Sequence, residues 1–433
     1  MILSRYDGIY KKNSRKYNTP KSVMNTHAEY ETGNSGQEIL ADPFISIAIH
    51  RMASDIVNQS ASVQPGEKVL LWFDPPGTPL VEELMNRCLA KGAFVSYFRR
   101  DLEADAQLIP KLTETEIAEY FDQQKRLIAD SDVVLIVRGP ANPEALKDVP
   151  EEKLRIYNEQ YTRAHRPRIT GETRWTLFYW PLPYEAEKEG MEYGEYFRLV
   201  LEACNQPWKE IKAAQKKLVD KLNGGKTLEL IANPDDPDPE RRTHVTMSIE
   251  GMTFANSTID LNFPGSEVFS APVKDSVNGQ IFAPGEYLSG SKLMKDIILR
   301  IENGRIVEAH AAGNDEALQE ILNSGEGARY FGEVALGTNP GLRRRLFNTL
   351  LNEKVGGSFH MAIGHCYEFD TYSGEPVSLN NGNTEDLTPV HWDLTVLMHP
   401  QYGGGRVVLD GENISENGQF LDPELSVLNP DLS

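Results

Sequence analysis

The strongest constraint on the fold is an alternation of apolar runs with helix-forming stretches in the first half of the chain. The apolar run 69–73, "VLLWF", is followed by a helical stretch that ends at Gly92, and a second apolar run comes next. The segment "ADSDVVLIVRGPANPEAL" repeats the order of strand, loop and helix. Strands that alternate with helices predict a mostly parallel sheet. Near-continuous apolar runs indicate strands that are covered on both faces. We therefore predict an α/β domain.

The end of this domain is marked by a helix and two glycines. The stretch "GEYFRLVLEACNQPWKEIKAAQKKLVDKL" predicts one long helix that ends at Asn223-Gly224-Gly225, because glycine often follows the last helical residue. We expect the α/β domain to span residues 41–225. No strand in it is followed by GxGxxG or GxxxxGK[ST]. The domain therefore resembles nucleotide-binding folds only in its order of strands and helices. The polar residues 1–40 lack periodicity and are expected to form an N-terminal arm.

The second half of the chain, residues 226–433, consists of short β-type runs separated by turn signals. The Asn-Gly pair within "ENGR" (302–305) predicts a tight hairpin, because this pair readily adopts positive φ. The acidic segment "NPDDPDPERR" is expected to be a surface hairpin loop. One helix is predicted at "NPGLRRRLFNTLL", with Asn339 as its cap and Pro340 at its first position. These features predict a β-rich α+β domain.

Composition narrows the class of function. Acidic residues outnumber basic ones by 64 to 44, and the formal net charge of −20 argues against nucleic acid or an anionic membrane as the main partner. The cysteines, Cys88, Cys204 and Cys366, are too sparse for a disulfide framework or a zinc finger and suit a reducing compartment, the cytoplasm. No run approaches 18 apolar residues, so no membrane span is expected.

Five ionisable residues lie inside the apolar β-type runs of the second domain. In the run "HWDL", His391 and Asp393 are two positions apart, and side chains at i and i+2 of a strand share one face. Carboxylates are rarely buried without a partner. Together the five residues predict a site for two divalent metals with nitrogen and oxygen ligands: Glu267, Glu333, His360, His391 and Asp393.

Each member of this set also has a purely structural explanation. Glu267 can be a surface residue at a turn, and Glu333 can pair with Arg329. His360 can be a hydrogen-bonded histidine of the core, and the His–Asp pair of "HWDL" can be a structural hydrogen bond. These alternatives predict a stable fold without a metal, so the residues alone leave both interpretations open.

The chemistry of the set favours a catalytic site. Because it contains no thiolate, it suits catalytic Zn, Co or Mn better than structural zinc, and a shared carboxylate can bridge two ions. Tyr367 and Glu353 are second-rank candidates, since a phenol can donate a hydrogen bond to a developing oxyanion. Strict alternation puts Tyr367 on the face opposite to His360, and a bend at Gly364 would bring the two together.

Several blocks around these residues resemble a known family, the thermophilic metallo-aminopeptidases of the aminopeptidase T and aminopeptidase S type, which are leucyl aminopeptidase-like. The resemblance covers roughly residues 45–421, with weaker blocks in the first domain such as "VQPGEKVLL" and "AKGAFV". The blocks that carry it most clearly are "NFPGSEVFSAPVKDSVNGQI", "GARYFGEVALGTNP", "NEKVGGSFHMAIGHCY" and "PVHWDL".

The resemblance implies a metal-dependent aminopeptidase that removes N-terminal amino acids from peptides, acts through two metal ions and forms a homodimer. It implies that the five residues of the set are metal ligands, with Glu333 as the bridge and as a catalytic residue. It also implies that Tyr367 is a catalytic tyrosine and that Glu353 is a further family carboxylate. Here Glu353 follows Asn352, where the family pattern has an Asp-Glu pair.

Two rival functions fit parts of the same pattern. Iron-dependent dioxygenases that open hydroxypyridine rings are similar to these peptidases and use two histidines and one aspartate for a single Fe(II). In this chain that triad would be His360, His391 and Asp393, but a mononuclear site has no use for Glu267 and Glu333. The second rival is a non-catalytic binding protein on the same fold.

Overall fold

The computed structural model describes residues 39–169, 171–289 and 292–432. The described residues from Asp42 onward belong to one compact unit, and the division of the chain at residue 225 remains a prediction. The predicted arm, residues 1–40, lies almost entirely outside the described residues. Over the described ranges, no helix combines the length and the apolar character needed to cross a membrane.

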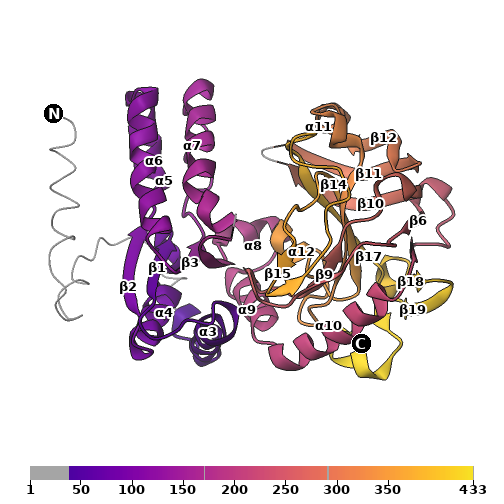
Figure 1. The fold of residues 1–433 in the computed structure, drawn as a ribbon, viewed down its shortest axis with the longest axis horizontal. Helices are drawn as coiled ribbons and strands as arrows, with labels where there is room; N and C mark the ends of the chain where they lie inside the picture. Colours follow the sequence, from indigo (N-terminus) through magenta and orange to yellow (C-terminus); the bar gives the residue numbers. More distant parts are fainter. Residues whose placement is uncertain (1–38, 170, 290–291, 433) are drawn as a thin grey trace. The chain divides into compact units, whose positions relative to one another are not determined.

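The first sheet is parallel, with strand order β2-β1-β3-β4-β8. Figure 1 labels its strands β1, β2 and β3. β1 and β3 are buried along nearly their whole length, so the prediction of a parallel α/β sheet covered on both faces is confirmed. β4, in which buried and partly exposed residues mostly alternate, was not predicted. The strands are β1 (Lys68–Phe73), β2 (Phe94–Arg99), β3 (Val133–Arg138), β4 (Arg174–Tyr179) and β8 (Asn262–Phe263).

Helices connect these strands. α6 begins with a capping box between Thr113 and Glu116, in which two backbone N–H groups are satisfied reciprocally. Its residue Ile128 packs against Leu70 and Val134 of the sheet. The helices of this part are α3 (Pro43–Asp55), α4 (Thr78–Ala90), α5 (Leu102–Leu108), α6 (Glu114–Ala129), α7 (Glu151–Ile169), α8 (Pro183–Glu189), α9 (Tyr193–Cys204) and α10 (Trp208–Asn223).

The long helix predicted before residue 225 is in fact two helices, α9 and α10, and that prediction was wrong in this respect. Pro207 lies between them, immediately before the first residue of α10. Proline lacks an N–H and disfavours helical backbone in the residue before it, so the helix ends ahead of Pro207. The predicted stop at Asn223 is where α10 ends.

The prediction of a helix that begins at Asn339 is also wrong, because only the short helix α12 (Thr349–Asn352) forms at the end of that segment. Asn339 accepts a hydrogen bond from the Gly341 N–H at 3.0 Å, as a cap would, but its amide donates to the carbonyls of Ala203 and Gly265. The chain after it is held by such tertiary contacts, which replace the backbone hydrogen bonds of a helix.

Most strands in the second half of the chain form two large antiparallel sheets, which confirms its predicted β-rich character. The exceptions are β8, which joins the parallel sheet, and a separate antiparallel pair of two short strands. The larger sheet has the order β12-β11-β10-β6-β5-β18-β19-β20. Its predicted "ENGR" hairpin joins β11 to β12, with positive φ at Asn303 and Gly304. Its strands are β5 (Thr227–Ala232), β6 (Thr243–Ser248), β10 (Asn278–Ser289), β11 (Lys292–Glu302), β12 (Arg305–Gly313), β18 (Gly405–Leu409), β19 (Glu412–Glu416) and β20 (Gln419–Phe420).

The smaller antiparallel sheet, with order β17-β14-β13-β9-β7, carries the candidate site. Its strands β9, β14 and β17 are labelled in Figure 1. Every residue of β9, β13 and β14 is buried. Its strands are β7 (Ala255–Ser257), β9 (Glu267–Ser270), β13 (Phe331–Gly337), β14 (Ser358–Gly364) and β17 (His391–Leu397). The helix α11 (Asp315–Leu322) packs against β11 and β12 of the larger sheet. The short pair β15 (Thr371–Tyr372) and β16 (Glu375–Pro376) lies beside the smaller sheet, where Tyr372 packs with Phe269 and Ala335.

Candidate metal centre

The smaller sheet brings the five predicted residues onto one face. Glu333 is opposite Ala362 of β14, two residues from His360, and Ala362 is opposite Asp393 of β17. His391 is two residues from Asp393 and therefore shares its face. On β9, Glu267 is opposite Gly337, which lies on the same face as Glu333. Four neighbouring strands thus contribute one or two ionisable side chains each.

A β-bulge sets the position of Glu333. The register between β13 and β14 shifts between Phe331 and Glu333, at Gly332. A Cβ atom at Gly332 would lie 2.0 Å from the carbonyl oxygen of His365, so only glycine fits this close approach. The bulge places Glu333 on the face shared with the histidines.

Glu333 lies between the two imidazoles. Its Oε1 is 3.2 Å from Nε2 of His360, and its Oε2 is 3.1 Å from Nε2 of His391. Oδ1 of Asp393 is 4.0 Å from the first of these nitrogens and 3.9 Å from the second. Oε2 of Glu267 is 3.6 Å from the His360 nitrogen. Each carboxylate oxygen of Glu333 therefore faces a different ligand group.

The donors form two overlapping groups whose ligand atoms lie within 4.8 Å of one another, and Glu333 belongs to both. One group is Glu267, Glu333 and His360, and the other is Glu333, His391 and Asp393. Oε2 of Glu267 and Oδ1 of Asp393 are buried and have no hydrogen-bond partner within the described chain. Because an unsatisfied buried carboxylate oxygen is costly, these donors fit divalent cations.

The surrounding contacts orient the ligands. Nδ1 of His391 is 2.7 Å from the carbonyl oxygen of His365, which can only accept, so Nδ1 is the donor and Nε2 faces the carboxylates. The ammonium of Lys354, a residue only 1% exposed, donates to Oε1 of Glu267 at 2.5 Å. This contact leaves Oε2 of Glu267 free to bind a cation. Nothing in the sequence pattern singled out Lys354, and the only hint is a lysine beside a buried strand.

The structure contradicts two of the structural explanations, the surface position of Glu267 and the pairing of Glu333 with Arg329. Glu267 is 6% exposed and is not a surface residue. The Arg329 guanidinium donates to the Ile306 carbonyl and to the Asn323 side chain, at 3.2 and 3.1 Å, rather than to Glu333. Nδ1 of His360 is buried without a partner among the described residues, so His360 is not a fully satisfied core histidine.

The electrostatics of the cluster follow from burial and proximity. Burial disfavours ionisation of Glu333, but hydrogen bonds from His360 and His391 outweigh it and lower its pKa to about 2. Burial disfavours the charged imidazoles, yet the contacts with Glu333 raise the pKa of His360 to about 9 and that of His391 to about 10. Burial and the Glu353 charge raise the pKa of Asp393 to about 7. The buried carboxylates of the site therefore stabilise positive charge on the groups beside them.

Tyr367 and Glu353 lie at the edge of the cluster and outside its two donor groups. β14 ends at Gly364, where φ is +107°, and the following residues bring the Tyr367 ring to 4.9 Å from the His391 ring, between centroids. The chain thus turns at the glycine where a bend was expected. The Glu353 carboxylate is 2.9 Å from the Lys354 ammonium.

Known proteins are similar to this chain over most of its length. The family model described as thermophilic metalloprotease (M29) matches residues 46–420. Aminopeptidase T of Thermus thermophilus is 28% identical over an aligned length of 376 residues, and the match covers 79% of this chain and 91% of that protein. Aminopeptidase 2 of Geobacillus stearothermophilus is 24% identical, over 76% of this chain and 86% of that protein.

A solved structure agrees on the fold. "Wild-type AmpT from Thermus thermophilus" superposes with a TM-score of 0.69 at 22% identity, and the match covers 87% of this chain and all of that one. The predicted fold class is thereby confirmed. The family match, which spans most of the chain, confirms the predicted resemblance and the predicted class of enzyme, a hydrolase that acts on peptide bonds. The chain belongs to the thermophilic metalloprotease (M29) family.

Proposed function

We propose that this protein is an aminopeptidase that uses two divalent metal ions, Zn, Co or Mn, to remove N-terminal amino acids from peptides. The observation that carries the proposal is the placement of Glu333, whose two oxygens face two imidazoles in two donor groups. The names of the relatives, aminopeptidase T and aminopeptidase 2, support cleavage at the amino-terminal end of the substrate.

The residues of the chain have distinct roles in this proposal. Glu267, Glu333, His360, His391 and Asp393 would hold the ions, with Glu333 as the bridging ligand. Bound ions would supply Lewis acidity and a water acidified towards neutral pH.

The groups that act on the substrate lie around this ligand set. A carboxylate at Glu333 or Glu353 would move the proton to the leaving amine. The Tyr367 hydroxyl would donate a hydrogen bond to the oxyanion of the tetrahedral intermediate. Burial and the Glu333 and Asp393 carboxylates raise the pKa of Tyr367 well above its usual value, so the hydroxyl keeps its proton.

The rival functions fit less well. A ring-cleaving dioxygenase would need only His360, His391 and Asp393, whereas the Glu333 carboxylate contacts both histidines. The family match favours a protease over this dioxygenase and over a non-catalytic binding protein. We also propose that the protein forms a homodimer, as the resemblance implies. We propose a cytoplasmic location, which the three buried free cysteines suggest.

We expect the enzyme to need a free amino terminus, because a free amine has a lone pair that can bind a metal ion held at this site, whereas the nitrogen of an acetylated terminus does not. The kcat/KM of leucine anilide is compared with that of N-acetyl-leucine anilide in the metal-loaded protein. The acetylated substrate should be about 10⁴-fold poorer, the range seen when a site's polar groups lose their partner. Similar rates for the two substrates would contradict an exopeptidase.

A further inference from the structure

Lys354 is a buried cation that joins two carboxylates at the edge of the candidate metal centre. Its Nζ lies 2.5 Å from Oε1 of Glu267 and 2.9 Å from Oε2 of Glu353. Lysine is almost never fully buried unless it is paired. Because a buried ion pair adds little net stability once the desolvation of its charges is counted, stability alone does not explain this lysine.

The backbone of Lys354 is held in place relative to Glu267. Its carbonyl accepts a hydrogen bond from the Asn339 N–H at 2.9 Å. The side-chain amide of Asn339, a fully buried residue, donates to the carbonyl of Gly265 at 3.2 Å, two residues before Glu267. Asn339 therefore ties the segment that carries Lys354 to the segment that carries Glu267.

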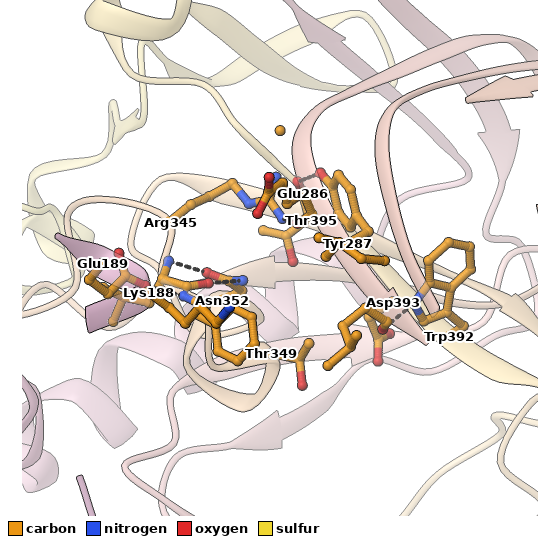
Figure 2. Close-up of a pocket in the computed structure, with 15 residues that line it drawn as sticks. Lys188, Glu189, Glu286, Tyr287, Arg345, Thr349, Asn352, Trp392, Asp393 and Thr395 are labelled. Carbon is orange, nitrogen blue, oxygen red and sulfur yellow. Dashed lines mark hydrogen bonds between the residues drawn. The ribbon is translucent and has the colours of Figure 1, made fainter. Parts of the chain in front are cut away.

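The turn that precedes Lys354 is anchored as well. The side chain of Asn352 accepts from the Leu346 N–H and donates to the Leu346 carbonyl, each at 2.6 Å. Figure 2 shows Asn352 in the wall of a cavity that Asp393 also lines. The segment that carries Lys354 is thus a fixed part of the surroundings of the metal centre.

A buried polar network fixes the backbone of Glu267. Nε2 of Gln215 donates to the Glu267 carbonyl at 3.1 Å and to the Thr338 hydroxyl at 2.9 Å. The hydroxyl of Ser266, the residue before Glu267, is 2.8 Å from that of Thr338. With the backbone fixed in this way, the direction of the Glu267 carboxylate depends on what holds its oxygens, and Lys354 holds Oε1.

We infer that Lys354 is a positioning residue of the metal centre. By binding Oε1 of Glu267, it directs Oε2, which lies 3.6 Å from Nε2 of His360, into the donor group. By binding Glu353, it keeps that carboxylate outside the two donor groups, at the edge of the site where it can act on the substrate. The inference rests on the proposed two-metal function.

The test compares Lys354→Met, which keeps the length of the side chain and removes its charge, with Lys216→Met, at a lysine whose side chain is 67% exposed. Metal-free protein is titrated with Zn or Mn in a calorimeter. Losing a group that orients a ligand typically costs about 10–100-fold in metal affinity. We expect that loss for one ion, the one that Glu267→Gln also weakens, and little change for the other. The Lys216 control should bind both ions as the wild type does.

Three results of this titration would overturn the inference. Unchanged metal affinity with only a lower melting temperature would show a purely structural lysine. Tighter binding would show that the ammonium only repels the metal. An equal loss for both ions would show a general disturbance of the sheet.

A double-mutant cycle tests the contact with Glu353. At saturating metal, Lys354→Met should lower kcat by about 10–100-fold, and by clearly less in a Glu353→Gln background, because residues that act through one another are coupled. Additive effects would overturn the role of Lys354 towards Glu353.

The double variant also covers two failures. If Lys354→Met alone does not fold, the double variant buries one unpaired carboxylate fewer, and it should still bind the Glu267 ion more weakly than Glu353→Gln does. Equal affinities in these two proteins would overturn the inference. If the wild type hydrolyses no peptide, the proposed function fails, and the metal titrations still decide whether Lys354 positions Glu267.

Discussion

Glu333→Gln is expected to lower kcat by at least about 10²–10⁴-fold, the usual cost of losing an acid–base group. The amide keeps the volume of the side chain, so β13 and the sheet should still form. It is, however, a neutral and weaker ligand, and it cannot take up a proton. Because Glu333 contacts His360 on one side and His391 on the other, both donor groups should lose affinity for metal together.

Three measurements on purified Glu333→Gln separate the possible outcomes: kcat, melting temperature and bound metal. Glu375→Gln, at an exposed carboxylate of β16, is the matched control and should behave like the wild type. A folded Glu333→Gln variant that keeps two ions and near-normal kcat would rule out Glu333 as the bridging ligand. A purely structural role would lower the melting temperature and leave turnover per folded molecule intact.

Exhaustive chelation is expected to abolish peptidase activity, and added Zn, Co or Mn should restore it. The ligand atoms are carboxylate oxygens and imidazole nitrogens, which suit these ions. Since a ligand that binds only the folded state stabilises it by about 2.7 kcal/mol at 100 times its Kd, the melting temperature should fall with the activity. Turnover that persists in protein shown by elemental analysis to be metal-free would contradict the metal-dependent mechanism.

The strand period made the site predictable in part. Charged residues inside apolar runs identified β9, β13, β14 and β17 as unusual strands, and the spacing of His391 and Asp393 placed them on one face. Which strands are neighbours, and in what register, depends on pairing between segments far apart in the chain. The shift at Gly332, which sets Glu333 on the ligand face, is a tertiary feature of this kind.

Local signals failed where long-range contacts compete with them. Asn339 and Pro340 form a good helix start, yet Arg345 is bonded to the carbonyls of Pro284 and Glu286 and holds the chain in another path. Lys354 was missed for a related reason. A lysine is normally exposed, and only the fold shows that its ammonium lies between Glu267 and Glu353.

The central claim is a pair of ions that share Glu333, and metal content tests it most directly. The wild-type protein is saturated with Zn or Mn, dialysed against metal-free buffer, and analysed for metal and protein by elemental and amino-acid analysis. The account predicts two equivalents per chain in the wild type and a loss of both in Glu333→Gln. One equivalent of iron, a single equivalent of any metal, or none in active wild-type protein would contradict it.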